Sequence, residues 1–224
     1  MDILTFDQLP QGGFAGLIER QFVTDRRVFR NAGNKPAFDG LENFVYLADA
    51  NFMPKGETTM HNHQEIDVIS VMVEGRISHA GSLEHGQGLE AGSAQVQRAG
   101  GEGFSHNEIN PDDTMNQMVQ LWVMPDEQGE AAGYKVYQPE TGQLNKIYGG
   151  KKDQDQTFHS HTAIAVSPLE AGQSVEQSGE VLAYLSKGSG VINGETIQAR
   201  TLVRADSISF SAAEESQLIV VYRD

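Results

Sequence analysis

The sequence predicts an all-β protein made of two similar halves, and three observations lead to this prediction. Glycine is frequent, with 24 in 224 residues, and short runs of Val, Ile, Thr and aromatic residues alternate with turn residues. Such a composition is typical of many short strands joined by tight turns. The strand-like runs fall on both sides of a polar, turn-rich segment at 126–156, and parts of the two halves resemble each other. A chain of this length can form two β-barrels, each with its own core.

The first half contains the strongest strand signals, which are dense from residue 43 onward. The expected strands lie at 43–52, 67–75 and 76–82, with two more within 88–109 and a last one at 115–125. Pro125 ends the last strand because proline cannot donate a hydrogen bond to a sheet. Helix is expected only in short pieces, one of them at 126–132.

A weak internal repeat relates the two halves. The segment "VMVEGRISHAG" around Gly75 resembles "YLSKGSGVINGE" around Gly188, at an offset of 113 residues. The segment "LEAGSAQVQRAG" at Gly92 resembles "LVRADSISFSAA" at Asp206, at an offset of 114. Two nearly equal offsets favour two copies of one small β-barrel. The expected N-terminal domain, connector and C-terminal domain span 1–125, 126–156 and 157–224.

The charge and cysteine content exclude several classes of function. Acidic residues number 31 and basic residues 16, so the formal net charge is −15. This balance disfavours direct binding to nucleic acid or to anionic membranes. The absence of cysteine excludes disulfides and thiolate chemistry. The N-terminal "MDILTFDQLPQGGFAG" has no signal-peptide pattern, and no run approaches the roughly 20 apolar residues of a membrane span, so we expect a cytoplasmic protein.

Four side chains of the first half form a candidate metal site. His61 and His63 stand two residues apart, as do His106 and Glu108. Residues two apart on a strand share a face, so pairing of the two strands would bring three imidazoles and one carboxylate together. Such a set suits Fe, Mn, Ni or Cu and leaves two positions of an octahedral ion free for small ligands. Zinc would more often be held in a closed, tetrahedral structural site.

The remaining histidines are interpreted differently. His159 and His161 repeat the spacing, but no histidine follows them, so further ligands would have to be Glu176 or Glu180. We therefore expect an exposed strand or a hydrogen-bonded pair at this position. The two histidines that flank the turn "AGSLEHGQG" are predicted to be solvated, namely His79 and His85.

These motifs resemble those of the pirin family. The family has a segment like "HPHRGFE…EG" and later "AGxGxxHxE", and the counterparts here are "HNHQEIDVISVMVEG", "AGGEGFSHNE" and the following "QLWVMP". The resemblance is clear over 43–125 and thin but collinear over 157–224. Asn62 stands in place of the proline between the histidines, and Asp67 stands where glutamate is common. The family implies a bicupin, in which two cupin-type double-stranded β-helix (jelly-roll) barrels pack together.

The resemblance also implies a metal and an activity. The iron ligands of the family fall on His61, His63, His106 and Glu108. The implied cofactor is one divalent transition metal, Fe(II) first, with Mn, Ni, Co, Cu and Zn as alternatives. Bacterial members of this kind are associated with quercetin 2,3-dioxygenase activity, in which dioxygen cleaves the central ring of a flavonol and releases carbon monoxide. The second barrel lacks the ligand set and is expected to be empty.

Three readings of the site remain open at this level. In the first, a metal-dependent dioxygenase acts on a small, flavonol-like aromatic substrate, and Glu108 accepts the proton of a hydroxyl whose pKa the metal lowers. In the second, which other family members imply, the protein is a non-enzymatic, redox-sensing regulator that binds a protein partner. In the third, the barrels are purely structural and the histidines are satisfied by hydrogen bonds.

Overall fold

The computed structural model describes residues 1–30, 36–83 and 86–224, and these residues confirm the all-β prediction. The chain forms two compact units, of which one is Leu9–Gln138 and the other combines Met1–Gln8 with Pro139–Asp224. Within the described residues, helical structure is limited to the short 3-10 turn η1 (Phe6–Gln8). No helix in this part of the chain is long and apolar enough to cross a membrane.

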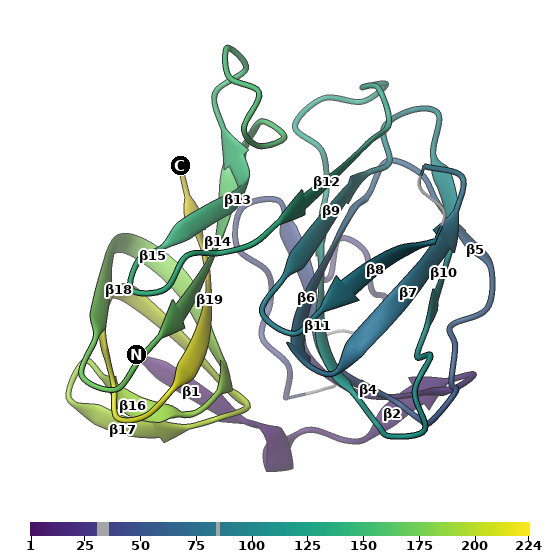
Figure 1. The fold of residues 1–224 in the computed structure, drawn as a ribbon. Helices are drawn as coiled ribbons and strands as arrows, with labels where there is room; N and C mark the ends of the chain where they lie inside the picture. The colour runs from purple at the N-terminus through teal and green to yellow at the C-terminus, as the bar shows by residue number, and fades with distance from the viewer. Residues whose placement is uncertain (31–35, 84–85) are drawn as a thin grey trace. The chain divides into compact units, whose positions relative to one another are not determined.

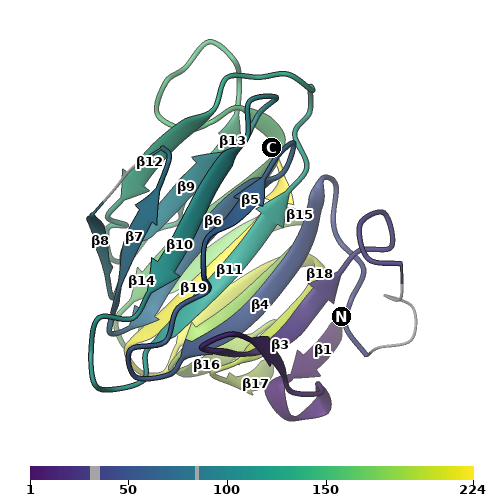
Figure 2. The ribbon, with the colours of Figure 1, turned by 90° about the vertical axis from the view of Figure 1, so that its right-hand side faces the viewer.

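The Leu9–Gln138 unit consists of two antiparallel sheets that face each other (Figures 1 and 2). The larger sheet has the order β12-β9-β6-β11-β4-β3-β2. Its strands are β2 (Gly12–Phe14), β3 (Leu17–Thr24), β4 (Phe44–Phe52), β6 (Asp67–Glu74), β9 (Ala94–Arg98), β11 (Gln117–Val123) and β12 (Gly133–Tyr137). The smaller sheet has the order β5-β10-β7-β8, with β5 (His61–His63), β7 (Arg76–Gly81), β8 (Gln87–Glu90) and β10 (Phe104–Ile109).

The interior of this unit is layered, because cross-strand partners share a face of the sheet. One layer is apolar, with Met118 opposite Met72 and Ala50. The next layer is polar, because Ser70 lies opposite both Gln120 and Gln95. The third layer contains Trp122, opposite Val68 and Tyr46. The polar layer has no counterpart in an ordinary hydrophobic core, and it lies beside the strand that carries His106 and Glu108.

The second unit contains one eight-stranded sheet, in the order β13-β14-β19-β15-β18-β16-β17 with β1 paired to β18. Its strands are β1 (Asp2–Thr5), β13 (Asn145–Gly150), β14 (Ser160–Leu169), β15 (Ser174–Lys187), β16 (Ser189–Ile192), β17 (Glu195–Gln198), β18 (Thr201–Ala212) and β19 (Ser216–Arg223). The core is apolar and includes the buried Val181, Leu185, Val203, Phe210 and Val220. The N-terminal strand belongs to this unit because β1 pairs with β18 in register Asp2 to Arg204.

The expected helix at 126–132 is wrong. Gly129 adopts a left-handed φ of 79°, which interrupts any helix, and its N–H donates to Oε1 of Glu65 at 2.9 Å. The carbonyl of Glu130 accepts from the N–H of Gly101 at 3.0 Å, so backbone groups of this segment bond to other loops rather than to each other. The segment 126–156, expected as a connector, contains β12 of one unit and β13 of the other.

The internal repeat is visible at one of its two proposed matches. Gly75 lies in the turn between β6 and β7, and Gly188 in the turn between β15 and β16, with φ values of 73° and 85°. Both turns require the left-handed conformation that glycine adopts without steric cost. The second match is out of register, because Gly92 lies in a turn between β8 and β9 whereas Asp206 lies inside β18.

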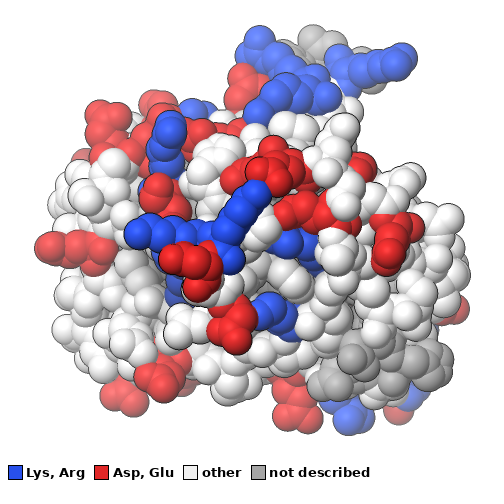
Figure 3. Space-filling view, turned by 90° about the horizontal axis from the view of Figure 1, so that it is seen from above, with Lys and Arg blue, Asp and Glu red and all other residues white. Residues whose placement is uncertain are grey.

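Charged side chains of both signs are interspersed on the face of the described residues shown in Figure 3. Several basic groups of the described residues have acidic partners, among them Arg26 with Asp39 and Arg76 with Asp112, at 2.9 and 2.8 Å. These two ion pairs are solvent-exposed and contribute little to stability.

Candidate metal centre

Three histidines converge between the sheets of the Leu9–Gln138 unit. Strands β5 and β10 pair so that His106 lies opposite His61, and Phe104 lies opposite His63. Each of the three imidazoles offers one ring nitrogen, and these nitrogens lie within 4.8 Å of one another. His63 and His106 are buried, whereas His61 is partly exposed. The cluster therefore has one side through which a small molecule can approach.

A backbone carbonyl orients the exposed ring. Nδ1 of His61 lies 2.9 Å from the carbonyl oxygen of Thr59, and a carbonyl can only accept, so Nδ1 carries the proton. Nε2 of His61 consequently presents its lone pair to Nε2 of His106, 3.0 Å away. A histidine that donates its other N–H to a carbonyl is typical of metal ligands. Thr59 has a φ of 64°, an unfavourable conformation for a β-branched residue and therefore a point of backbone strain beside the cluster.

The buried imidazoles are neutral at physiological pH. Burial, followed by the nearby His61, lowers the pKa of His63 from 6.5 to about 4. Burial and the neighbouring imidazoles lower the pKa of His106 to about 2. Nε2 of His63 and Nδ1 of His106 have no hydrogen-bond partner within the described part of the chain. A buried nitrogen without a partner is costly, and neutral imidazoles are the form that metals bind, so the cluster fits a transition metal.

Glu108 lies beside the cluster on the same strand but does not belong to the group of three. Its carboxylate is fully buried and is held by three donors. Oε1 accepts from Oγ of Ser70 at 2.7 Å and from Nε2 of Gln95 at 3.0 Å. Oε2 accepts from Nε2 of Gln120 at 3.1 Å. Burial raises the pKa of Glu108 to about 7, although the three hydrogen bonds lower it.

A tyrosine from β12 orients one of these donors. The hydroxyl of Tyr134 donates to Oε1 of Gln95 at 2.9 Å, which turns Nε2 of Gln95 toward Glu108. Sequence reasoning missed Ser70, Gln95, Gln120 and Tyr134. One signal was available, because glutamines at inward-facing positions of otherwise apolar strands require buried partners.

The prediction that His79 is solvated is wrong. His79 is fully buried, with its ring 5.5 Å from that of His106, and a ring nitrogen lies 2.9 Å from Nε2 of Gln97. On β7 it shares the inward face with Ile77 and Gly81, and that alternation places it inside the barrel. His85 lies outside the described residues.

The second histidine pair is not part of a metal-binding group among the described residues. His159 precedes β14 and His161 lies on it. The carboxylates considered as their partners bond elsewhere: Glu176 accepts from Oγ of Ser209 at 3.1 Å, and Glu180 pairs with Arg204 at 2.6 Å.

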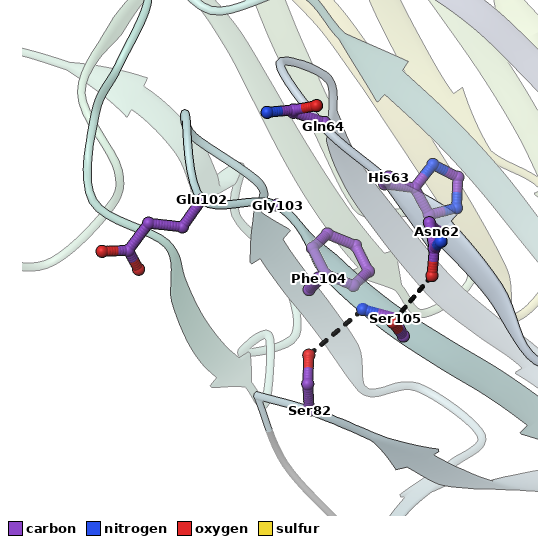
Figure 4. A pocket seen from close by; sticks show the side chains of 8 residues that line it. All are labelled: Asn62, His63, Gln64, Ser82, Glu102, Gly103, Phe104 and Ser105. Carbon is purple, nitrogen blue, oxygen red and sulfur yellow. Dashed lines mark hydrogen bonds between the residues drawn. The ribbon is translucent and has the colours of Figure 1, made fainter.

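A shallow pocket of about 360 Å³ lies beside His63 and is shown in Figure 4. Part of its polar lining comes from the outward side chains of β5 and β10, where Oγ of Ser105 donates to Oδ1 of Asn62 at 2.7 Å. Asn62, which replaces the proline of the family motif, therefore points away from the three imidazoles. Asp67 is buried and accepts from the N–H of Ala99 at 3.1 Å, so it anchors the glycine-rich loop before β10.

The fold and the site define the class of the protein. Two units of antiparallel sheet, one of which encloses a histidine cluster, make the chain a bicupin. The model of the Pirin family matches residues 25–123, and a provisionally named quercetin 2,3-dioxygenase of Pseudomonas aeruginosa is 30% identical over 174 residues, covering 72% of this chain and 75% of that protein. The chain belongs to the pirin family.

Two further comparisons extend over most of the chain. The quercetin 2,3-dioxygenase of Escherichia coli K12 is 25% identical over 170 residues, covering 71% of this chain and 73% of that protein. The crystal structure of the bacterial pirin YhhW from Escherichia coli in complex with nickel(II) matches with a TM-score of 0.80 at 18% identity, covering 98% of this chain and 97% of that chain. At this identity the structural match shows the fold.

Proposed function

We propose that the Leu9–Gln138 unit binds one divalent first-row transition metal, with Fe(II) as the first candidate. The ligands are three histidines and one glutamate, namely His61, His63, His106 and Glu108. The cluster of three imidazoles supports this proposal, because Nε2 atoms of two of them already lie 3.0 Å apart. A divalent ion would take the place of the proton that these two nitrogens share. A bacterial pirin of the same fold, YhhW of Escherichia coli, has been crystallised in complex with nickel(II), which supports a metal in this family.

We further propose that the protein is a dioxygenase of the quercetin 2,3-dioxygenase type. The names of the relatives in Pseudomonas aeruginosa and Escherichia coli support this substrate class. When bound, the metal supplies a positive charge that lowers the pKa of a coordinated hydroxyl. Glu108, which lies two residues after His106 on β10, would be the carboxylate that accepts that proton. The rings of Phe104 and Trp122, 5.2 and 5.6 Å from that of His63, exclude water from one side of the centre.

The direct test measures metal content and turnover in the same preparation. The protein is reconstituted with Fe(II), its metal content is determined, and quercetin is added in air. We expect loss of the visible flavonol band together with release of carbon monoxide. His106→Ala should lose both signals and the metal. His161→Ala, a histidine of the other unit, is the matched control and should retain them.

The remaining results of this experiment separate the alternatives. Stoichiometric metal without flavonol turnover would contradict the dioxygenase and favour the metal-binding regulator. Less than one tenth of an equivalent of any transition metal after reconstitution would overturn the metal site and leave a structural bicupin. Full turnover in a folded His106→Ala variant would place the chemistry elsewhere.

A further inference from the structure

Two readily oxidised aromatic side chains, Trp122 and Tyr46, extend from His63 through successive ring contacts. The ring of Trp122, the chain's only tryptophan, is 5.6 Å from the ring of His63. The ring of Tyr46 is 4.5 Å from that of Trp122, because the two residues are direct cross-strand partners on β11 and β4 (Figure 2). Phe29 stacks on both, at 5.4 and 6.0 Å. The three rings from His63 to Tyr46 are therefore in successive contact.

The two aromatic residues differ in whether they can lose a proton. Nε1 of Trp122 is buried and has no acceptor among the residues described. The hydroxyl of Tyr46, in contrast, donates to Oε2 of Glu19 at 2.9 Å. The other oxygen of Glu19 accepts from Nε2 of Gln21 at 2.7 Å, so the carboxylate is held in place. Burial, followed by the charge of Glu19, raises the pKa of Tyr46, which keeps the phenol protonated at rest.

This difference determines in which direction a hole, meaning the site of a missing electron, moves between Trp122 and Tyr46. An oxidised indole that cannot release its proton remains a strong oxidant of its neighbours. An oxidised phenol is very acidic, and transfer of its proton to an adjacent carboxylate lowers its energy. A hole created on Trp122 should therefore move to Tyr46, where it remains as a tyrosyl radical. Glu19 also lines a surface depression of about 360 Å³, through which a dissolved reductant can approach the pair.

We propose that Trp122, Tyr46 and Glu19 form a protective electron-transfer path that drains oxidising equivalents from the metal centre. This inference rests on the proposed metal site. A bound metal that hydrogen peroxide has oxidised in the absence of an organic substrate would take one electron from Trp122 and would itself be reduced by one electron. Trp122 takes one electron from Tyr46, and the O–H bond of Tyr46 breaks as its proton passes to Oε2 of Glu19. One electron from a reductant and the return of that proton restore the neutral phenol of Tyr46 and the carboxylate of Glu19.

Other aromatic residues near the centre lack this combination. Phe104 is 5.2 Å from His63, but a phenyl ring is much harder to oxidise than an indole or a phenol. Tyr134 is 5.8 Å from His79, and its hydroxyl donates to the amide oxygen of Gln95, which is a poor proton acceptor. Tyr46 combines a ring contact with Trp122 and a carboxylate that accepts from its hydroxyl.

The path can be tested without any metal. Because Trp122 is the only tryptophan, light absorbed by indole alone ionises that residue, with a dissolved electron acceptor present. Transient absorption should show the indole radical converting into a tyrosyl radical. In Tyr46→Phe the indole signal should persist, and in Glu19→Gln the conversion should slow at least tenfold. Tyr148→Phe, a buried tyrosine of the other unit, should behave as the parent. An unchanged tyrosyl signal in Tyr46→Phe would overturn the path.

A second experiment connects the path to the metal. Iron-loaded protein, with its iron content measured first, is mixed with hydrogen peroxide and frozen for electron paramagnetic resonance. We expect a tyrosyl radical that disappears in Tyr46→Phe and in Trp122→Phe, with more oxidised His63 in both variants by mass spectrometry. A radical that survives both substitutions would overturn the proposal. Failure of the parent to bind iron would contradict the proposed function, while the optical result would still decide whether the path exists.

Discussion

The hydroxyl of Tyr134 lies 2.9 Å from Oε1 of Gln95 and decides which end of that amide faces Glu108. An amide can present either its oxygen or its nitrogen to a neighbour, and only the nitrogen donates to a carboxylate. Because the hydroxyl holds the oxygen, Nε2 of Gln95 points to Glu108 at 3.0 Å. A residue on β12 thereby controls the carboxylate next to the histidine cluster.

Tyr134→Phe should weaken metal binding without unfolding the protein. The substitution removes the group that orients Gln95, so the amide can turn its oxygen toward Glu108 and repel it. Residues that orient metal ligands typically change affinity by about 10–100-fold when they are removed. We expect a loss of about tenfold in Co(II) affinity and a changed visible Co(II) spectrum, measured by titration. Tyr137→Phe, on the same strand, is the control. Unchanged affinity and spectrum in Tyr134→Phe would contradict the role of this hydrogen bond.

Binding of metal should stabilise the native protein through the three imidazoles. A ligand that binds only the folded state adds about 2.7 kcal/mol at a concentration 100 times its dissociation constant. We expect a clear rise in the thermal midpoint of the parent with Mn(II), Co(II) or Ni(II). His63→Ala should lose this rise, whereas His161→Ala should keep it. An equal rise in both variants would show that the metal binds elsewhere.

The stability of the metal-free protein should fall on acidification, because of its buried histidines. The pKa values of His63 and His106 are lowered from 6.5 to about 4 and about 2. For groups with lowered values, the stability is present above the unfolded pKa of 6.5 and is lost as pH falls. The lowered pKa of His63 alone corresponds to about 3 kcal/mol of unfolding free energy. Denaturant unfolding between about pH 5 and 6.5 measures this slope.

Glu108 should reduce the rise of the unfolding free energy with pH that His63 and His106 cause. Its pKa is raised from 4.5 to about 7, so its contribution to stability is present at low pH and is lost as pH rises toward 7. Between these values the folded protein holds one proton on Glu108, while the unfolded chain holds about two on His63 and His106. Glu108→Gln removes the opposing proton, so the pH slope of the unfolding free energy should roughly double. Equal slopes in the parent and the variant would contradict a protonated Glu108 in the metal-free protein.

Local periodicity was enough to predict the three histidines as neighbours. His61 and His63 share a face of their strand, and the pairing of β5 with β10 places His106 opposite His61. The strands at 43–52 and 67–75 could also be predicted, because both contain several β-branched or aromatic residues and are followed by turn residues. These features depend on residues close in sequence and on the alternation of a strand.

The surroundings of Glu108 could not be predicted in this way. Ser70, Gln95 and Gln120 come from three strands whose order in the sheet is not readable from spacing. Tyr134 lies in a segment whose polar, glycine-containing composition concealed an edge strand. His79 was misjudged for a similar reason, since its exposure depends on which sheet covers β7. Polar residues inside a barrel are recognisable only when their partners are known.

Gly103→Ala should damage the metal centre without touching a ligand side chain. Gly103 has a φ of 72°, and a Cβ atom there would lie 2.7 Å from the carbonyl oxygen of His63, so the end of β5 would have to move. The left-handed conformation alone costs alanine about 1–2 kcal/mol. Gly129→Ala separates the cost of the left-handed conformation from the steric clash, because Gly129 has a φ of 79° and no atom lies within 4 Å of its Cβ position. Both variants should lose stability in denaturant, Gly103→Ala the more because of its backbone clash, but only Gly103→Ala should also lose Co(II) affinity, by tenfold or more given the displacement of a ligand. If the two variants bound Co(II) equally well, the backbone of His63 would not be part of what holds the three imidazoles together.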